Sequence, residues 1–269
     1  MIPYAQVIGD PIAHSKSPVI HGFWLDALGI DARYDAEHVT PPMLRDYFVR
    51  AAADPHWRGC NVTIPHKIAT LDHVGDPGGV RASIGAVNTV FRGEGGALVG
   101  TNTDAAGFYA PLAETDLAGS HAVVIGSGGA ARAILFALAR MDVERVTLVA
   151  RNPLKGAGLL SIFGLKGDVV GFDAPLPPAD LLVNASPLGM AGQPALELDL
   201  DPLPEDAIVY DIVYAPLETP LLAAARSRDL ATIDGLEMLI GQAAAAFELF
   251  FGAAPPRDRD AELRARLTA

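Results

Sequence analysis

The stretch HAVVIGSGGAARAILFALARM, residues 121–141, constrains the fold of this chain more than any other part of it. A strand-like apolar run precedes a glycine cluster, and an apolar helical run follows it. Within the cluster, Gly126, Gly128 and Ala131 have the spacing G-x-G-x-x-A. Glycines placed in this way allow a tight turn and let the backbone approach a pyrophosphate, which the helix N-terminus attracts. The spacing alone is a weak signal. Between a strand and a helix, however, it predicts a dinucleotide-binding unit rather than a packing turn.

The rest of the chain alternates strand-like and helical runs. After residue 141 the strand-like runs are VERVTLVA, DVVGF, ADLLVNAS, AIVYDIV and ATID, with helical TPLLAAARSRDL before the last. This order predicts a doubly wound parallel sheet. In the first hundred residues, AQVIGDP, ARYDAEHV and GCNVTIP are strand-like and flank helical PVIHGFWLDALGI and PPMLRDYFVRAAA, which predicts another α/β layer. Near the end, IGQAAAAFELFFG predicts a long apolar helix.

Length, charge and cysteine content narrow the possible functions. The chain has 269 residues, enough for two domains, and a net charge of −12 argues against nucleic acid or anionic membranes as partners. No apolar run is long enough to span a bilayer, and MIPYAQVIGDP lacks the pattern of a signal peptide. The single cysteine, Cys60, excludes an internal disulfide, and we interpret it as a small buried hydrophobic residue. Together these features predict a cytoplasmic location.

The end of the second strand after the glycine cluster indicates which dinucleotide fits. NAD-binding folds carry an acidic residue there, which holds the ribose hydroxyls. Here the strand ends in LVARNPLK, which contains Arg151 and Lys155 and no acid. A guanidinium at this place suits a 2′-phosphate, so the sequence favours NADP. The alternative is that Arg151 is an ordinary solvated surface residue.

A set of motifs in a fixed order resembles the shikimate dehydrogenase family over nearly the whole chain. They are GDPIAHSKSP, NVTIPHK, GAVNT, TNTDAAG, GSGGAARA, NASPLGM, DIVYAPLETPLL and DGLEMLIGQAAAAF. The resemblance implies reversible, NADPH-dependent reduction of 3-dehydroshikimate to shikimate, in chorismate and aromatic amino acid biosynthesis. It also implies a substrate-binding α/β domain over residues 1–103 and a Rossmann-type cofactor domain over 104–236. The helical segment 237–269 would return to the substrate domain.

The resemblance assigns the substrate to a group of polar residues. The two serines of the family's S-x-S motif bind the substrate carboxylate, and they correspond to Ser15 and Ser17 in AHSKSP. Each hydroxyl would donate to one carboxylate oxygen at a helix start, where the helix dipole also favours an anion. A structural reading competes, with Ser17 as the helix cap and Ser15 as a turn residue. The other expected substrate contacts are Thr63, Lys67, Asn88, Asp104, Tyr214 and Gln242.

Gln242 and Tyr214 can also be judged from their surroundings. At helical spacing Gln242 shares an apolar face with Met238 and Ala246, where an unpaired amide would cost free energy. It therefore either binds groups within the protein or reaches a ligand. Tyr214, in DIVYAP, could line the same cleft, but a packed core tyrosine fits almost as well.

Interconversion of a ketone and an alcohol needs hydride transfer at carbon and proton transfer at oxygen. The cofactor supplies the hydride, whereas the proton needs a positioned acid or base. Lys67 is our candidate, because an ammonium also stabilises a developing alkoxide, and Asp104 would orient it. Ketone reduction needs the protonated lysine, so oxidation should improve as the pH rises. The competing reading is a surface ion pair of Lys67 and Asp104, worth little free energy.

Several expectations complete the prediction. His14 and His66 lack metal-ligand spacing, so we expect no metal. Quinate oxidation and a non-catalytic metabolite sensor are alternative functions, and the choice between monomer and homodimer stays open. Residues 75–79 are rich in glycine and should form a loose connection where relatives have a helix, with no function that we can name. The expected cofactor contacts are Gly126, Ser127, Gly128, Gly129, Ala130, Arg151, Asn152, Lys155 and Gly235.

Overall fold

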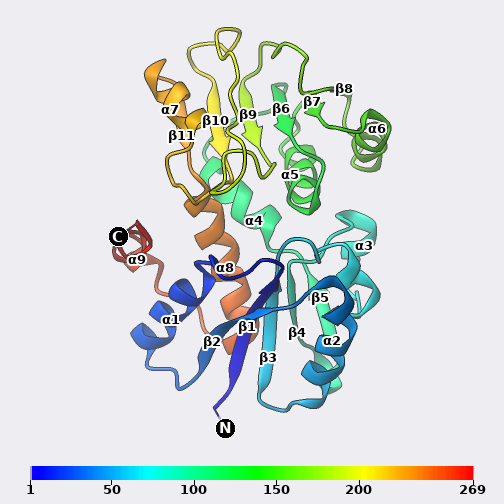
Figure 1. Cartoon of the computed structure of the whole chain (residues 1–269), viewed down its shortest axis with the longest axis vertical. Coiled ribbons are helices and arrows are strands. Elements are labelled where there is room, and N and C mark those ends of the chain that lie inside the picture. The colour runs from blue at the N-terminus through cyan, green and yellow to red at the C-terminus, as the bar shows by residue number, and fades with distance from the viewer. Residues whose placement is uncertain (1, 269) are drawn as a thin grey trace. The chain divides into compact units, whose positions relative to one another are not determined.

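The computed structural model describes residues 2–268, which divide into two compact units (Figure 1). The first unit combines Met1–Thr103 with Ile240–Ala269, and the second is Asp104–Leu239. Helix α8 (Gly235–Phe251) runs from the second unit into the first. Residues 240 onward therefore group with the N-terminal segment.

The first unit is built on a mixed sheet. Its strand order is β2-β1-β3-β4-β5; β1, β2 and β3 are parallel, whereas β4 and β5 pair antiparallel. The sequence analysis anticipated the parallel strands and missed the hairpin, because its strands are only four residues long. The strands are β1 (Tyr4–Gly9), β2 (Arg33–His38), β3 (Trp57–Val62), β4 (Thr89–Arg92) and β5 (Leu98–Thr101). The helices besides α8 are α1 (Ser17–Leu28), α2 (Leu44–Ala53), α3 (Val80–Ser83) and α9 (Asp260–Thr268).

Residues 73–79 form an irregular connection, as expected from their glycines. A 3₁₀ turn over Ala69–Asp72 precedes them, and the short helix α3 follows. The carboxylate of Asp76 accepts the backbone N–H groups of Val80 at 2.6 Å and Arg81 at 2.8 Å. Because these donors lie in the first turn of α3, Asp76 restarts the helix after the loose segment.

An aromatic cluster joins α1 to α8 in the core of the first unit. The rings of His21 and Tyr34 stack with centroids 3.9 Å apart, and Trp24 and Phe247 pack against His21. His21 is fully buried, and neither ring nitrogen has a hydrogen-bond partner within residues 2–268. Burial lowers the pKa of His21 to about 3, and the Asn61 side chain opposes this shift. The imidazole is therefore neutral across the physiological range.

The second unit has a parallel sheet in the order β11-β10-β9-β6-β7-β8. The strand order reverses beside β6, the strand that leads into the glycine cluster. Doubly wound sheets bind their ligands at such a reversal point. The strands are β6 (His121–Ile125), β7 (Arg145–Val149), β8 (Gly167–Val170), β9 (Leu181–Asn184), β10 (Ile208–Asp211) and β11 (Ala231–Ile233). The helices are α4 (Asp104–Tyr109), α5 (Gly129–Arg140), α6 (Pro153–Ile162) and α7 (Pro220–Ser227).

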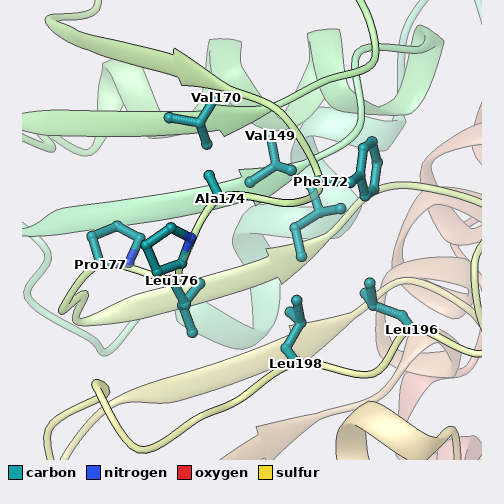
Figure 2. A pocket seen from close by; sticks show the side chains of 10 residues that line it. Val149, Val170, Phe172, Ala174, Leu176, Pro177, Leu196 and Leu198 are labelled. Carbon is teal, nitrogen blue, oxygen red and sulfur yellow. The ribbon is translucent and has the colours of Figure 1, made fainter.

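The two faces of this second sheet are covered differently. Core residues of α5 and α6, such as Ile134 and Leu159, pack on one face. On the other face, α7 shares the cover with the irregular segment 185–207, whose Leu196 and Leu200 are buried. A small apolar pocket lies among the strand ends and this segment, and Figure 2 shows Val149, Leu176, Leu196 and Leu198 around it. Side-chain packing rather than a helix thus closes this part of the core.

Two further expectations meet the structure here. Cys60 is fully buried, and burial raises the pKa of its thiol to about 12, which confirms the small hydrophobic reading. Within residues 2–268, no helix has the length and hydropathy needed to cross a bilayer.

The buried imidazole predicts a loss of stability in acid. An unfolded histidine has a pKa near 6.5, whereas folded His21 has a pKa of about 3. Below pH 6.5 the unfolded chain therefore binds a proton that the folded chain does not bind until about pH 3. Between pH 7 and pH 5, His21 should lower the free energy of unfolding by about 2 kcal/mol. His21→Phe should remove this part of the pH dependence, whereas His56→Phe should keep it. Denaturant unfolding at both pH values measures the difference, and an unchanged acid slope in His21→Phe would contradict the assignment.

Candidate active site

The carboxyl ends of β1 and β3 bring the first group of expected site residues together. The Thr63 N–H donates to the Ile8 carbonyl at 3.0 Å, so the chain after β3 continues beside β1. A Cβ atom on Gly9 would lie 2.5 Å from Thr63 Cγ2, and glycine is what lets the threonine side chain sit there. The sequence NVTIPHK therefore starts its turn at the same sheet edge as GDPIAHSKSP.

Backbone hydrogen bonds add Lys67 and Asn88 to this edge. The Val62 N–H donates to the Asn88 carbonyl, and the Val87 N–H donates to the Lys67 carbonyl, both at 2.7 Å. Next to Lys67, buried His66 bonds through Nε2 to the Val39 carbonyl at 2.6 Å. His66, which had no role in the sequence analysis, thus fastens the turn that carries Lys67.

A buried polar network surrounds Asn88. Its Nδ2 group donates to Thr103 Oγ1 at 2.9 Å and to Gln242 Oε1 at 3.3 Å. Its Oδ1 atom accepts the Thr103 N–H at 2.7 Å and the Thr89 hydroxyl at 3.0 Å. Gln242 therefore has internal partners, as one of its two readings required. A role toward a ligand stays a prediction.

Sequence reasoning missed Tyr34, Asn61 and Thr103 as members of this network. The Tyr34 hydroxyl donates to Asn61 Oδ1 at 2.6 Å, and Asn61 Nδ2 donates to Thr89 Oγ1 at 3.2 Å. Burial raises the pKa of Tyr34 well above its ordinary value, so its hydroxyl keeps the proton that it donates. One signal was present in the sequence. Asn61 is an amide inside the apolar run GCNVTIP, and a buried amide needs partners.

Residues 13–18, AHSKSP, form the serine loop, and its structure differs from one expectation about helix capping. Helix α1 starts at Ser17, its N-cap residue is Lys16, and Lys16 provides no side-chain cap. The bond of capping type comes instead from Ser15, whose Oγ accepts the Ser17 N–H at 3.3 Å. The prediction that Ser17 caps the helix is therefore wrong, because the helix begins one residue earlier than assumed. Ser17 is already inside the first turn, and its side chain is buried.

Asp104 and Tyr214 belong to the second unit. Asp104 is the first residue of α4 and is 4% exposed. Tyr214 follows β10, and burial raises the pKa of its hydroxyl. The expected pair of Lys67 and Asp104 joins residues of different units, and it stays a prediction, as does a substrate contact of Tyr214.

The glycine cluster has the shape that a bound pyrophosphate needs. Gly126 has a φ of +112°, and a Cβ atom there would lie 2.8 Å from the Ala185 carbonyl oxygen. At Gly128, by contrast, no atom of residues 2–268 other than those of its chain neighbours lies within 4 Å of a Cβ position. Gly128 precedes α5, so the first N–H groups of that helix, from Gly129 and Ala130 onward, lack helical acceptors. This open backbone and these donors fit a phosphate group.

The chain after β7 carries the expected cations. Arg151 and Lys155 are exposed, and Asn152 Oδ1 caps α6 by accepting the Lys155 N–H at 3.1 Å. Asn152 thus has a structural role besides any cofactor contact. Gly235 also has a packing role, since a Cβ atom there would lie 2.4 Å from the Ile212 carbonyl oxygen. Contacts of these residues and of Ser127 with a cofactor stay predictions.

The turn geometry yields a stability prediction. Gly126→Ala should lower the free energy of unfolding by about 1–3 kcal/mol, because the new Cβ would clash with the Ala185 carbonyl and alanine is strained at a positive φ. Gly158→Ala is the matched control: it lies within α6 with no atom near its Cβ position, and it should gain about 0.4–1 kcal/mol. Chemical denaturation measures both variants. Equal stability of Gly126→Ala and the unchanged protein would rule out the strained turn.

Family models match both ends of the chain. One described as "Shikimate dehydrogenase substrate binding domain" matches residues 7–90, and one described as "Shikimate 5'-dehydrogenase C-terminal domain" matches residues 235–262. A shikimate dehydrogenase (NADP(+)) of Sphingopyxis alaskensis is 66% identical over 267 residues, which cover 99% of this chain and 97% of that protein.

Solved structures of related enzymes match almost the whole chain. The shikimate 5-dehydrogenase of Thermus thermophilus, in complex with NADP(H) and shikimate, has a TM-score of 0.86 at 36% identity, covering 99% of this chain and 100% of that one. The ligand-free 5-ketofructose reductase of a Gluconobacter species has a TM-score of 0.88 at 30% identity, covering 99% of each chain. With 66% identity to a curated member along 99% of its length, this chain belongs to the shikimate dehydrogenase family.

Proposed function

We propose that this protein is an NADP-dependent shikimate dehydrogenase, which reversibly reduces 3-dehydroshikimate to shikimate in the route to chorismate and the aromatic amino acids. The observation that carries the proposal is the 66% identity to a shikimate dehydrogenase (NADP(+)) along almost the entire chain. The test is direct. Purified protein should consume NADPH when 3-dehydroshikimate is added and form NADPH from shikimate and NADP. Quinate in the same assay tests the broader activity.

The first unit would bind the substrate. Shikimate carries a carboxylate and several ring hydroxyls, and the hydroxyls of Ser15 and Ser17 would donate to the carboxylate beside the start of α1. Thr63, Asn88 and Gln242 would meet the ring hydroxyls. The burial and mutual bonding of Asn88 and Gln242 support this role, because a fixed polar surface can select one arrangement of hydroxyls.

Lys67 and Asp104 would manage the proton at the reacting oxygen. A bound NADPH would supply the hydride for the carbonyl carbon. The Lys67 ammonium donates a proton to the carbonyl oxygen and stabilises the charge that develops there. Asp104 orients Lys67 and accepts a hydrogen bond from a substrate hydroxyl. In the oxidative direction Lys67 must be neutral to accept the proton.

The second unit would hold NADP. The open backbone at Gly128 and the first N–H groups of α5 fit the pyrophosphate, and Arg151 with Lys155 would bind the 2′-phosphate. Residues 150–155, directly after β7, contain no acid, whereas NAD-selective folds use one at that place. A cytoplasmic location is part of the proposal and rests on the sequence alone, which leaves the choice between monomer and homodimer open.

Removing the lysine tests the proton transfer. Lys67→Ala should lower kcat by about 10²–10⁴-fold, because proton transfer loses its positioned group. KM for shikimate should change far less. Lys166→Ala, an exposed lysine after α6 in the second unit, is the control and should leave kcat unchanged. Steady-state kinetics with both variants decide the point, and a near-normal kcat for Lys67→Ala would remove Lys67 from the mechanism.

Replacing the guanidinium tests the cofactor assignment. Arg151→Ala should raise KM for NADP by about 10- to 150-fold, the equivalent of one charge-assisted hydrogen bond, and leave KM for NAD nearly unchanged. Lys155→Ala should have a smaller effect, since an ammonium bonds less directionally than a planar fork. Arg140→Ala, at the opposite end of α5 from the glycine cluster, serves as the control. Equal use of NAD and NADP by the unchanged protein would overturn the assignment.

A further inference from the structure

Lys16 stands between the two serines of AHSKSP, and the proposed mechanism leaves it without a task. Its Nζ donates to the backbone carbonyl of Leu267 at 2.5 Å, across 251 residues of sequence. Leu267 lies in the last turn of α9, where carbonyl groups lack helical donors and the helix dipole favours a cation. The serine loop is thus fastened to the C-terminal helix.

Helix α9 is itself held against α1 by contacts that do not involve Lys16. The guanidinium groups of Arg259 and Arg266 both contact the Phe23 ring of α1, at 4.8 Å and 4.7 Å from its centroid. Glu262 accepts hydrogen bonds from both arginines, at 3.0 Å from Arg259 Nε and 2.7 Å from Arg266. These bonds lower the pKa of Glu262, so its carboxylate stays charged between them. Leu263 is fully buried on the same helix, which completes a firm anchor for α9.

The fixed ammonium restrains both neighbours of Lys16. The backbone carbonyl of Lys16 accepts the N–H groups of Val19 at 3.1 Å and Ile20 at 3.2 Å, so the Lys16 backbone is part of the start of α1. Ser15 is held by two bonds of its own: its Oγ accepts the Ser17 N–H, and its N–H donates to the Ile12 carbonyl. With the backbone held by α1 and the side chain held by α9, the loop has little freedom to reorient either hydroxyl.

We propose that Lys16 is a positioning residue, which fixes Ser15 and Ser17 through its bond to α9 and so makes the C-terminal helix a determinant of carboxylate affinity. This inference rests on the proposed function. The ammonium is committed to a protein carbonyl and is not a direct ligand of the substrate. Its contribution is preorganisation: the loop loses less conformational entropy when the substrate binds.

The variants separate positioning from direct binding. Lys16→Met keeps the aliphatic stem and removes the donor, and Lys16→Arg restores a donor. Arg259→Ala with Arg266→Ala removes the clamp, which is the pair of guanidinium groups over Phe23, and changes no residue of AHSKSP. Lys166→Met makes the same chemical change at an exposed site of the second unit. All variants are made in the full chain, and their free energies of unfolding are measured alongside kcat and both KM values.

Lys16→Met should raise KM for shikimate about 10-fold, with kcat within twofold and KM for NADP unchanged. Lys16→Arg should recover most of the loss, and Lys166→Met should match the unchanged protein. The arginine double variant should also raise KM for shikimate. Adding Lys16→Met to it should then cost less than in the unchanged background, because coupled residues are not additive.

Fully additive effects, or a normal KM for shikimate in Lys16→Met, would overturn the inference. If Lys16 contacted the carboxylate directly, its loss would cost the same with or without the clamp. Failure of the proposed function has a different signature, since the unchanged protein would then show no turnover of shikimate with NADP.

Discussion

The carboxamide of Asn88 is the constraint on which the site of the first unit depends. Its oxygen and nitrogen together bond to Thr89, Thr103 and Gln242, and its backbone carbonyl accepts the Val62 N–H at the end of β3. The side chain and backbone of Asn88 together thus tie β3 and β4 to α8. A buried amide has few arrangements that satisfy every donor and acceptor, so the network permits essentially one geometry. A surface held in this way suits the substrate contact proposed above, because fixed donors and acceptors can select one arrangement of hydroxyls.

Charge is distributed with the same economy. The chain carries a net charge of −12, yet its expected ligands are anions. The cations available to such ligands are therefore local: Lys67 follows the threonine motif, and Arg151 and Lys155 follow β7. Elsewhere, most arginines form surface ion pairs with acids, as Arg50 does with Glu37. The overall negative field discourages nonspecific anions, while short-range donors act where a bound anion displaces water.

How much the sequence predicted depended on how local each signal was. The parallel strands, the glycine turn and the irregular connection over residues 75–79 rest on neighbouring residues, and all were correctly predicted. The β4–β5 hairpin was missed because its strands are short. Long-range bonds left no pattern: the Lys16–Leu267 contact spans the chain, and Tyr34 met Asn61 only through strand pairing. The serine cap was misassigned by a shift of one residue, which is the usual uncertainty at a helix start.

The discontinuous first unit has a consequence for how the chain acquires its fold. The second unit is one continuous segment, Asp104–Leu239, and all of its strands are present before α8 is complete. The first unit draws Phe247 and Phe250 into its aromatic cluster from α8, which follows the second unit in the chain. During synthesis from the N-terminus, the sheet of β1 to β5 must therefore wait, its apolar face unsealed, while more than a hundred later residues emerge. The second unit can therefore complete its sheet first on the ribosome, and the first unit closes only after Phe247 and Phe250 have been made.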